Sequence, residues 1–171
     1  FVVIAVGLFG IAEIATNLES KEVRGVLQSK IGRLWPTREE FKDSWAAVLR
    51  GTGVGTILGV LPGGGATLSA FSAYSVEKRI SKTPEKFGHG AIAGVAGPEA
   101  ANNAGAQSSF IPLLTLGIPS NSIMAMMLGA MTIHGITPGP SVIQNQPELF
   151  WGLVASMWLG NAMLLVINLP L

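Results

Sequence analysis

The sequence contains no cysteine and carries little charge. Without cysteine, disulfides and thiolate metal sites are excluded, and the redox compartment is left open. Charged residues make up 12% of the chain, whereas soluble domains carry about 25%. A net charge of +1 with no basic tail gives no indication of nucleic-acid binding.

The few charges are unevenly distributed. Of the eleven Lys and Arg residues, seven fall within residues 21–50 and four within residues 78–86. Beyond residue 86 the only charged side chains are Glu99 and Glu148. A water-facing surface needs charge, and 49% of the residues are hydrophobic, so the sequence predicts an integral membrane protein.

The N-terminal part predicts one membrane span followed by a surface segment. Residues 1–18 are apolar enough for a transmembrane helix and lack the basic start of a signal peptide, so we expect an internal piece of a larger multi-span protein. Glu13 should face protein or water. Residues 19–50 are interpreted as a cytoplasmic loop and an amphipathic interfacial helix that opens at Pro36 and Thr37.

Residues 51–76 form an apolar segment that is interrupted at its centre. Pro62, Gly63, Gly64 and Gly65 follow one another there, and both residue types break helices. A single crossing would place the two basic blocks on opposite sides of the membrane, against the positive-inside tendency. We therefore expect a re-entrant hairpin whose arms, at about 16 Å each, reach roughly half-way into the hydrocarbon core.

The rest of the chain continues this pattern. The predicted segments are a cytoplasmic loop (77–88), a buried helix (89–110), a second broken helix or hairpin (111–134), an external loop without Lys or Arg (135–148) and a transmembrane helix (149–171). The predicted fold class is therefore an all-α, multi-span integral membrane protein with two re-entrant or broken helix hairpins.

The two breaks resemble each other, and this predicts a binding site. Each has a glycine and one or two apolar residues, then a proline, then residues that expose backbone N–H groups (GVLPGGG and GIPSNS). Two such breaks are typical of an inverted repeat of discontinuous helices. Such helix ends bind carboxylates without a basic side chain, and the freed carbonyls can coordinate Na⁺. The candidate substrate-binding residues are Gly63, Gly64, Gly65, Thr67, Ser120, Asn121 and Ser122. The alternative is that both prolines only kink buried helices for packing.

A second group of polar residues lies in the segment PEAANNA. Glu99, Asn102 and Asn103 are spaced to share one helix face, and they are candidates for holding a coupling cation or proton. The alternative for Glu99, which directly follows Pro98, is that it caps the start of a helix.

No enzyme motif is complete. The glycine run lacks the G-K-[ST] ending of a P-loop, no G-x-S-x-G elbow is present, and His89 and His134 have no partner at metal-ligand spacing. We expect neither catalysis nor a metal beyond a bound Na⁺. The G-x-x-x-G pairs Gly55/Gly59 and Gly90/Gly94 predict close helix packing.

An ordered series of motifs from about residue 50 to residue 171 resembles the TctA family, the large membrane subunit of tripartite tricarboxylate transporters. The series is LPGxG, Y-x-x-EK-x-x-SK, FG-x-G, PEAANNA, LGIP and PGP, and the likeness is weaker in the N-terminal third. Ser120 departs from the glycine that this family commonly has after the second proline.

This resemblance implies secondary, ion-driven uptake of organic anions, di- and tricarboxylates such as citrate, by part of a larger transporter. It also implies a small membrane subunit and a periplasmic solute-binding protein as partners, and a multi-pass location in a bacterial inner membrane. No cofactor is implied other than coupling Na⁺ or H⁺. The alternative function is a non-transport scaffold or a channel. The same backbone donors would hold citrate, tartrate, glutamate or an aromatic acid.

Overall fold

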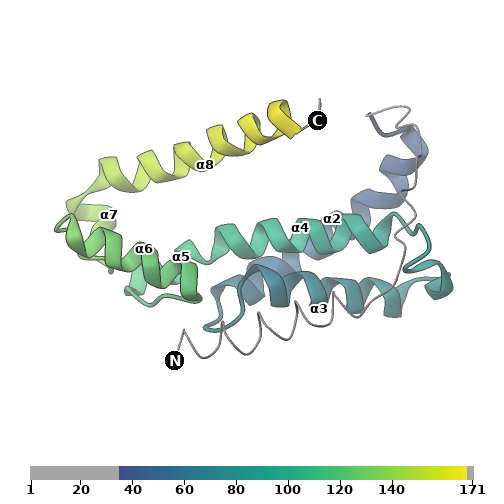
Figure 1. Cartoon of the computed structure of the whole chain (residues 1–171), viewed down its shortest axis with the longest axis horizontal. Coiled ribbons are helices and arrows are strands. Elements are labelled where there is room, and N and C mark those ends of the chain that lie inside the picture. Colours follow the sequence, from purple (N-terminus) through teal and green to yellow (C-terminus); the bar gives the residue numbers. More distant parts are fainter. Residues whose placement is uncertain (1–34, 169–171) are drawn as a thin grey trace, which may run out of the picture. The chain divides into compact units, whose positions relative to one another are not determined.

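The computed structural model describes residues 35–168. The predicted transmembrane helix 1–18 and the first part of the predicted segment 19–50 lie outside the described residues. Within residues 35–168 all regular structure is helical (Figure 1). The helices are α2 (Arg38–Val60), α3 (Gly65–Ile80), the 3₁₀ turn η1 (Pro84–Lys86), α4 (Ala93–Ser108), α5 (Phe110–Leu116), α6 (Ser122–Ile133), α7 (Val142–Asn145) and α8 (Pro147–Asn168).

Helix α2 begins at a capping box and runs without interruption to the first proline. The Thr37 hydroxyl accepts from the Glu40 N–H at 3.2 Å, and the Thr37 N–H donates to the Glu40 carboxylate at 2.7 Å. This last hydrogen bond lowers the pKa of Glu40 below its usual value. The structure has no boundary at residue 50 between an interfacial helix and a hairpin arm, because nothing between Arg50 and Val60 breaks the helix.

Small residues recur every three or four positions on α2, α3 and α4, and they allow these helices to pack closely. The buried residues are Ala47, Gly51, Gly55 and Gly59 on α2, Gly65, Ser69, Ala73 and Glu77 on α3, and Gly97, Ala101, Gly105 and Ser108 on α4. A Cβ atom at Gly55 would overlap the Ala101 carbonyl oxygen. The close packing predicted for Gly55/Gly59 is confirmed.

The same prediction for Gly90/Gly94 is wrong. Gly90 precedes α4 and has φ +99°, a left-handed conformation that suits glycine in a turn. Gly94 lies in α4 but faces the ring of Phe87 and not another helix backbone.

A partly buried ion pair joins α2 to α3. Arg50 donates from Nε and Nη2 to the two carboxylate oxygens of Glu77, each at 2.8 Å. The Glu77 side chain is 3% exposed, and that of Arg50 is 45% exposed. Through these two hydrogen bonds, Arg50 gives each oxygen of the buried Glu77 carboxylate a donor.

The C-terminal helices have a small core of their own and one long apolar helix. Leu113, Leu114, Met124 and Met131 form the buried cluster. Of the described helices, only the segment Pro147–Ile167 is both long and apolar enough to cross a membrane. This segment corresponds to the predicted span 149–171, but it begins two residues earlier. That it crosses the membrane stays a prediction.

The remaining predicted bounds also shift by a few residues. Helix α3 extends to Ile80 into the predicted loop 77–88, and α7 lies within the predicted loop 135–148. The predicted buried helix 89–110 corresponds to α4, which is buried along one face only.

Candidate functional site

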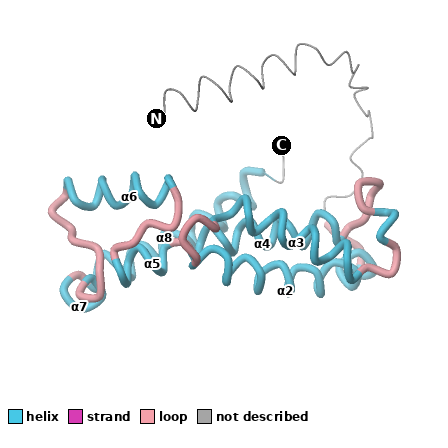
Figure 2. Tube along the Cα trace, turned by 90° about the horizontal axis from the view of Figure 1, so that it is seen from below, coloured by secondary structure: helices cyan, strands magenta, loops and turns pink. Residues whose placement is uncertain are grey.

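Both predicted breaks separate helices in the structure, and they lie against each other. Residues 61–64 connect α2 to α3, and residues 117–121 connect α5 to α6, where Figure 2 shows the connecting loop in pink. The Gly63 N–H donates to the Ser120 carbonyl oxygen at 2.8 Å. The chain thereby brings together two loops that are distant in sequence.

The three glycines of the first break are required for separate reasons. Gly63 and Gly65 have φ +80° and +69°, a region that costs non-glycine residues roughly 1–2 kcal/mol. A Cβ atom at Gly64 would overlap the Leu58 carbonyl oxygen. The run Gly63–Gly65 therefore permits α2 to end and α3 to begin within a few residues.

The second break is held by side-chain hydrogen bonds. Asn121 accepts from the Met124 N–H at 3.0 Å, which caps α6, and its amide donates to the Ser109 hydroxyl at 3.2 Å. Ser120 is buried, and its hydroxyl points to the Ser109 carbonyl oxygen at 3.5 Å. These contacts fix the loop on the end of α4.

The two helix starts differ in how they are capped. Helix α6 is capped by Asn121, whereas no side chain of the described residues caps α3. The N–H groups of Gly65, Ala66 and Thr67 in the first turn of α3 have no partner within the helix. Of the two, α3 therefore presents the more open positive end of a helix dipole.

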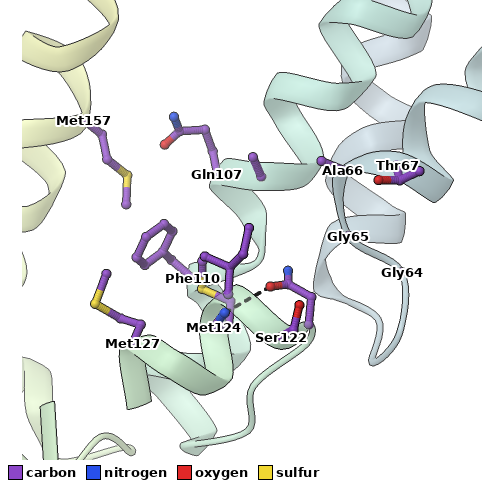
Figure 3. Close-up of a pocket in the computed structure, with 13 residues that line it drawn as sticks. Gly64, Gly65, Ala66, Thr67, Gln107, Phe110, Ser122, Met124, Met127 and Met157 are labelled. Carbon is purple, nitrogen blue, oxygen red and sulfur yellow. Dashed lines mark hydrogen bonds between the residues drawn. The ribbon is translucent and has the colours of Figure 1, made fainter. Parts of the chain in front are cut away.

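The start of α3 opens into a cavity of about 420 Å³, which we name the head cavity (Figure 3). Its lining residues are Gly64, Gly65, Ala66, Thr67, Ala106, Gln107, Phe110, Asn121, Ser122, Ile123, Met124, Met127 and Met157. None of them is charged. The cavity thus combines an uncapped helix start and a few polar side chains with an apolar wall.

Five of the seven predicted substrate-binding residues line the head cavity. They are Gly64, Gly65, Thr67, Asn121 and Ser122. The other two, Gly63 and Ser120, are not among its lining residues and instead share the hydrogen bond that joins the two breaks. Sequence reasoning gave no role to Phe110 or to the three methionines, whose apolar character also fits an ordinary core.

Gln107 was also missed as a lining residue. Gln107 is four residues beyond Asn103, so the two share one face of a helix of mostly small apolar residues. This spacing would have predicted Gln107 as a further polar residue of the site.

The structure divides the three coupling-ion candidates between two places. Asn103 donates to the backbone carbonyl and the carboxylate of Glu99 at 2.9 and 3.1 Å, and both side chains are exposed. Asn102 instead lines a second cavity of about 440 Å³, which we name the side cavity, with Thr67, Ala70, Phe71, Tyr74 and Pro98. Helix α4 begins at Ala93 and continues through Pro98, so Glu99 does not cap a helix start.

Two proteins of Agrobacterium vitis are similar to the chain. An uncharacterized 52.8 kDa protein in the TAR-I ttuC′ 3′ region is 59% identical over 171 residues, which are all of this chain and 34% of that protein. A second, in the TAR-II ttuC′ 3′ region, is 66% identical over 117 residues, which are 68% of this chain and 48% of that protein. The chain thus spans about a third of the first relative, and no solved structure matches it.

The family comparison covers the whole chain. The model described as the tripartite tricarboxylate transporter TctA family matches residues 1–171, including the two breaks and the helices around the head cavity. The chain therefore belongs to the tripartite tricarboxylate transporter TctA family.

Proposed function

We propose that this chain is part of the membrane subunit of a secondary, ion-driven transporter of organic anions, and that α3 holds a substrate carboxylate in the head cavity. Membership of the TctA family supports a transporter component. The meeting of the two helix breaks beside the head cavity supports the position of the site.

The observation that carries this proposal is that, among residues 35–168, no side chain caps the start of α3 and no charged residue lines the cavity there. A helix N-terminus acts as roughly half a positive charge, and its free N–H groups point along the axis at an anion. The Thr67 and Ser122 hydroxyls and the Gln107 amide lie around the same space as further donors. Together these groups can bind a carboxylate without Lys or Arg.

The remaining features of the transporter follow from the family and the sequence pattern. We propose re-entry of the α2–α3 pair from the cytoplasmic side, a multi-pass bacterial inner-membrane location, and coupling to Na⁺ or H⁺ through Asn102 or the Glu99–Asn103 pair. The proposed partners are a small membrane subunit and a periplasmic solute-binding protein. The proposed substrates are di- and tricarboxylates such as citrate, and the family name refers to tricarboxylates.

A purely structural role is the second candidate, because the Gly63–Ser120 hydrogen bond also serves packing. In that case the breaks would shape a scaffold or a channel, and no carboxylate would bind in the head cavity.

Alkylation of single cysteines distinguishes the two candidates. Ser122→Cys places a thiol in the head cavity, and Ser75→Cys places one on the exposed face of α3. In full-length protein freed of other cysteines, we expect a carboxylate substrate to slow alkylation of the first variant severalfold and to leave the second unchanged. Equal rates with and without every acid in a panel of carboxylates would favour the scaffold.

A further inference from the structure

We propose that a polar cavity at the connection between α3 and α4 binds the phosphate of an anionic phospholipid headgroup. This cavity, which we name the lysine cavity, has a volume of about 560 Å³. Its lining residues are Asp43, Ser81, Lys82, Thr83, Lys86, Phe87, Gly90, Ala91, Ile92 and Ala93. The proposal depends on the membrane location proposed above and is independent of the substrate site in the head cavity.

The fold brings the two basic stretches of the described sequence together at one end of the α2–α3 pair. Arg50, in the first stretch, forms its ion pair with Glu77, which directly precedes the second. Lys and Arg gather on the cytoplasmic side of membrane proteins, so we expect this end to lie among the headgroups of the cytoplasmic leaflet. Basic pockets between helices at that surface bind anionic lipid headgroups.

The second lysine of the cavity is carried by a turn whose backbone is fixed. The Lys86 carbonyl oxygen accepts from the N–H groups of His89 and Ala91 at 2.9 and 3.2 Å. Phe87 is buried, and its ring packs edge-on against a tyrosine of α3 with centroids 5.5 Å apart. Little backbone entropy therefore has to be lost at Lys86 when an anion binds.

The charge of the lysine cavity matches one phosphodiester. Lys82 and Lys86 supply two positive charges, and the Asp43 carboxylate offsets one of them. The Ser81 and Thr83 hydroxyls add neutral donors. A phosphodiester carries a single negative charge, and lysine ammonium groups bind phosphate oxygens well. One anionic headgroup therefore balances the charge that remains in the cavity.

Apolar side chains beside the cavity suit the rest of a lipid. Ile92 lines the cavity and is partly exposed, and Ile80 at the end of α3 is exposed as well. On α2 the exposed aromatic residues Phe41 and Trp45 stand on either side of Asp43 in the sequence. Tryptophan is enriched at the headgroup level of membranes. A lipid therefore gains apolar contacts that a soluble phosphate does not, and we assign the cavity to a lipid.

Lipid binding to the full-length protein, delipidated in detergent, tests this proposal. The probes are phosphatidylglycerol, which is anionic, phosphatidylethanolamine, which carries the same phosphodiester with a balancing ammonium group, and inorganic phosphate. Native mass spectrometry measures the bound lipid. We expect phosphatidylglycerol to bind about tenfold more tightly than phosphatidylethanolamine, and an excess of inorganic phosphate to leave it bound.

Two matched double variants separate binding in the cavity from diffuse attraction to a basic surface. Lys82→Gln/Lys86→Gln removes two cations that line the cavity, and Lys78→Gln/Arg79→Gln removes two exposed cations from the last turn of α3 that do not. We expect the first to weaken phosphatidylglycerol about tenfold or more and the second less than about threefold. Asp43→Asn should strengthen it severalfold, because a repelling carboxylate is lost. Unchanged unfolding midpoints without added lipid show that each variant is folded.

Three results would overturn the proposal. Equal losses in the two double variants would show diffuse attraction only. Tighter binding of phosphatidylethanolamine would show a site for a zwitterion, and displacement by inorganic phosphate would show a site for a soluble anion. None of these results bears on the protection of Ser122→Cys by a carboxylate. If that protection were absent while phosphatidylglycerol bound as expected, the proposed substrate site would fall and the lysine cavity would stand.

Discussion

Gly63 donates its backbone N–H to the carbonyl oxygen of Ser120 at 2.8 Å. This hydrogen bond joins two loops that each interrupt a helix, and it places the start of α3 beside the start of α6. The head cavity exists because these two interruptions coincide in space.

Substitution of Gly64 should abolish uptake while the protein still inserts into the membrane. A side chain at this position overlaps the Leu58 carbonyl oxygen, so the end of α2 has to move and the first turn of α3 with it. Gly64→Leu and the control Gly129→Leu, whose side chain would enter open space on α6, should be compared in membrane vesicles. Normal uptake by Gly64→Leu would show that the first break is not part of the substrate site.

The buried glycines of α2, such as Gly55, should tolerate no added methyl group. Gly55→Ala overlaps the backbone of α4 at Ala101, and we expect it to destabilise the full-length protein by about 1–3 kcal/mol, as overpacking does. Gly53→Ala meets open space on the same helix and should be neutral or stabilising by up to about 1 kcal/mol. Thermal unfolding in detergent measures both. Equal midpoints for the two variants would contradict the observed α2–α4 packing.

Removal of Arg50 should be more harmful than removal of a neighbouring exposed cation. Arg50→Ala leaves the buried Glu77 carboxylate without its two hydrogen bonds, and we expect a loss of about 1–3 kcal/mol, because water reaches the half-exposed side of the pair.

Two comparisons control the Arg50 prediction, with stability again measured by thermal unfolding in detergent. Glu77→Gln should cost less than Arg50→Ala, because the amide leaves no buried charge unpaired. Lys78→Ala should change stability by less than about 0.5 kcal/mol. Similar losses for Arg50→Ala and Lys78→Ala would show that the ion pair contributes nothing.

Asn103→Leu should weaken the dependence of uptake on the driving ion. The substitution removes both hydrogen bonds from Asn103 to Glu99 and so frees a carboxylate that we propose takes part in coupling. Initial rates of uptake measured against Na⁺ concentration and pH report this effect, with Asn145→Leu on α7 as the control. An unchanged ion dependence would count against coupling at this pair and leave Asn102 as the candidate.

The sequence predicted the local features best. Proline and glycine chemistry located both helix breaks, since a proline followed by three glycines disfavours a helix at the first break and Pro119 disfavours one at the second. The same reasoning selected five residues that line the head cavity. Of the two interpretations of Glu99, the helix cap is wrong, because Pro98 is tolerated inside α4 and does not begin a new helix.

Features that depend on distant parts of the chain could not be predicted. Nothing local indicates that the Gly63 N–H pairs with Ser120, so both residues were assigned to the site and not to the contact between the breaks. The Arg50–Glu77 pair likewise depends on how α2 packs against α3. Neutral lining residues such as Met124 carry no local sign of a binding role.

Disulfide cross-linking tests the meeting of the two breaks most directly. An ideal Cβ atom at Gly65 lies 3.7 Å from the Asn121 Cβ, close to the mean Cβ separation of about 3.8 Å in disulfides. In full-length protein freed of other cysteines, we predict that mild oxidation cross-links the double variant Gly65→Cys/Asn121→Cys. It should leave Gly53→Cys/Asn121→Cys reduced. Because φ at Gly65 is +69° and Asn121 caps α6, each single variant must first support uptake. If the double variant of two such active single variants stays reduced under conditions that oxidise exposed thiols, the two breaks do not meet and the proposed site is contradicted.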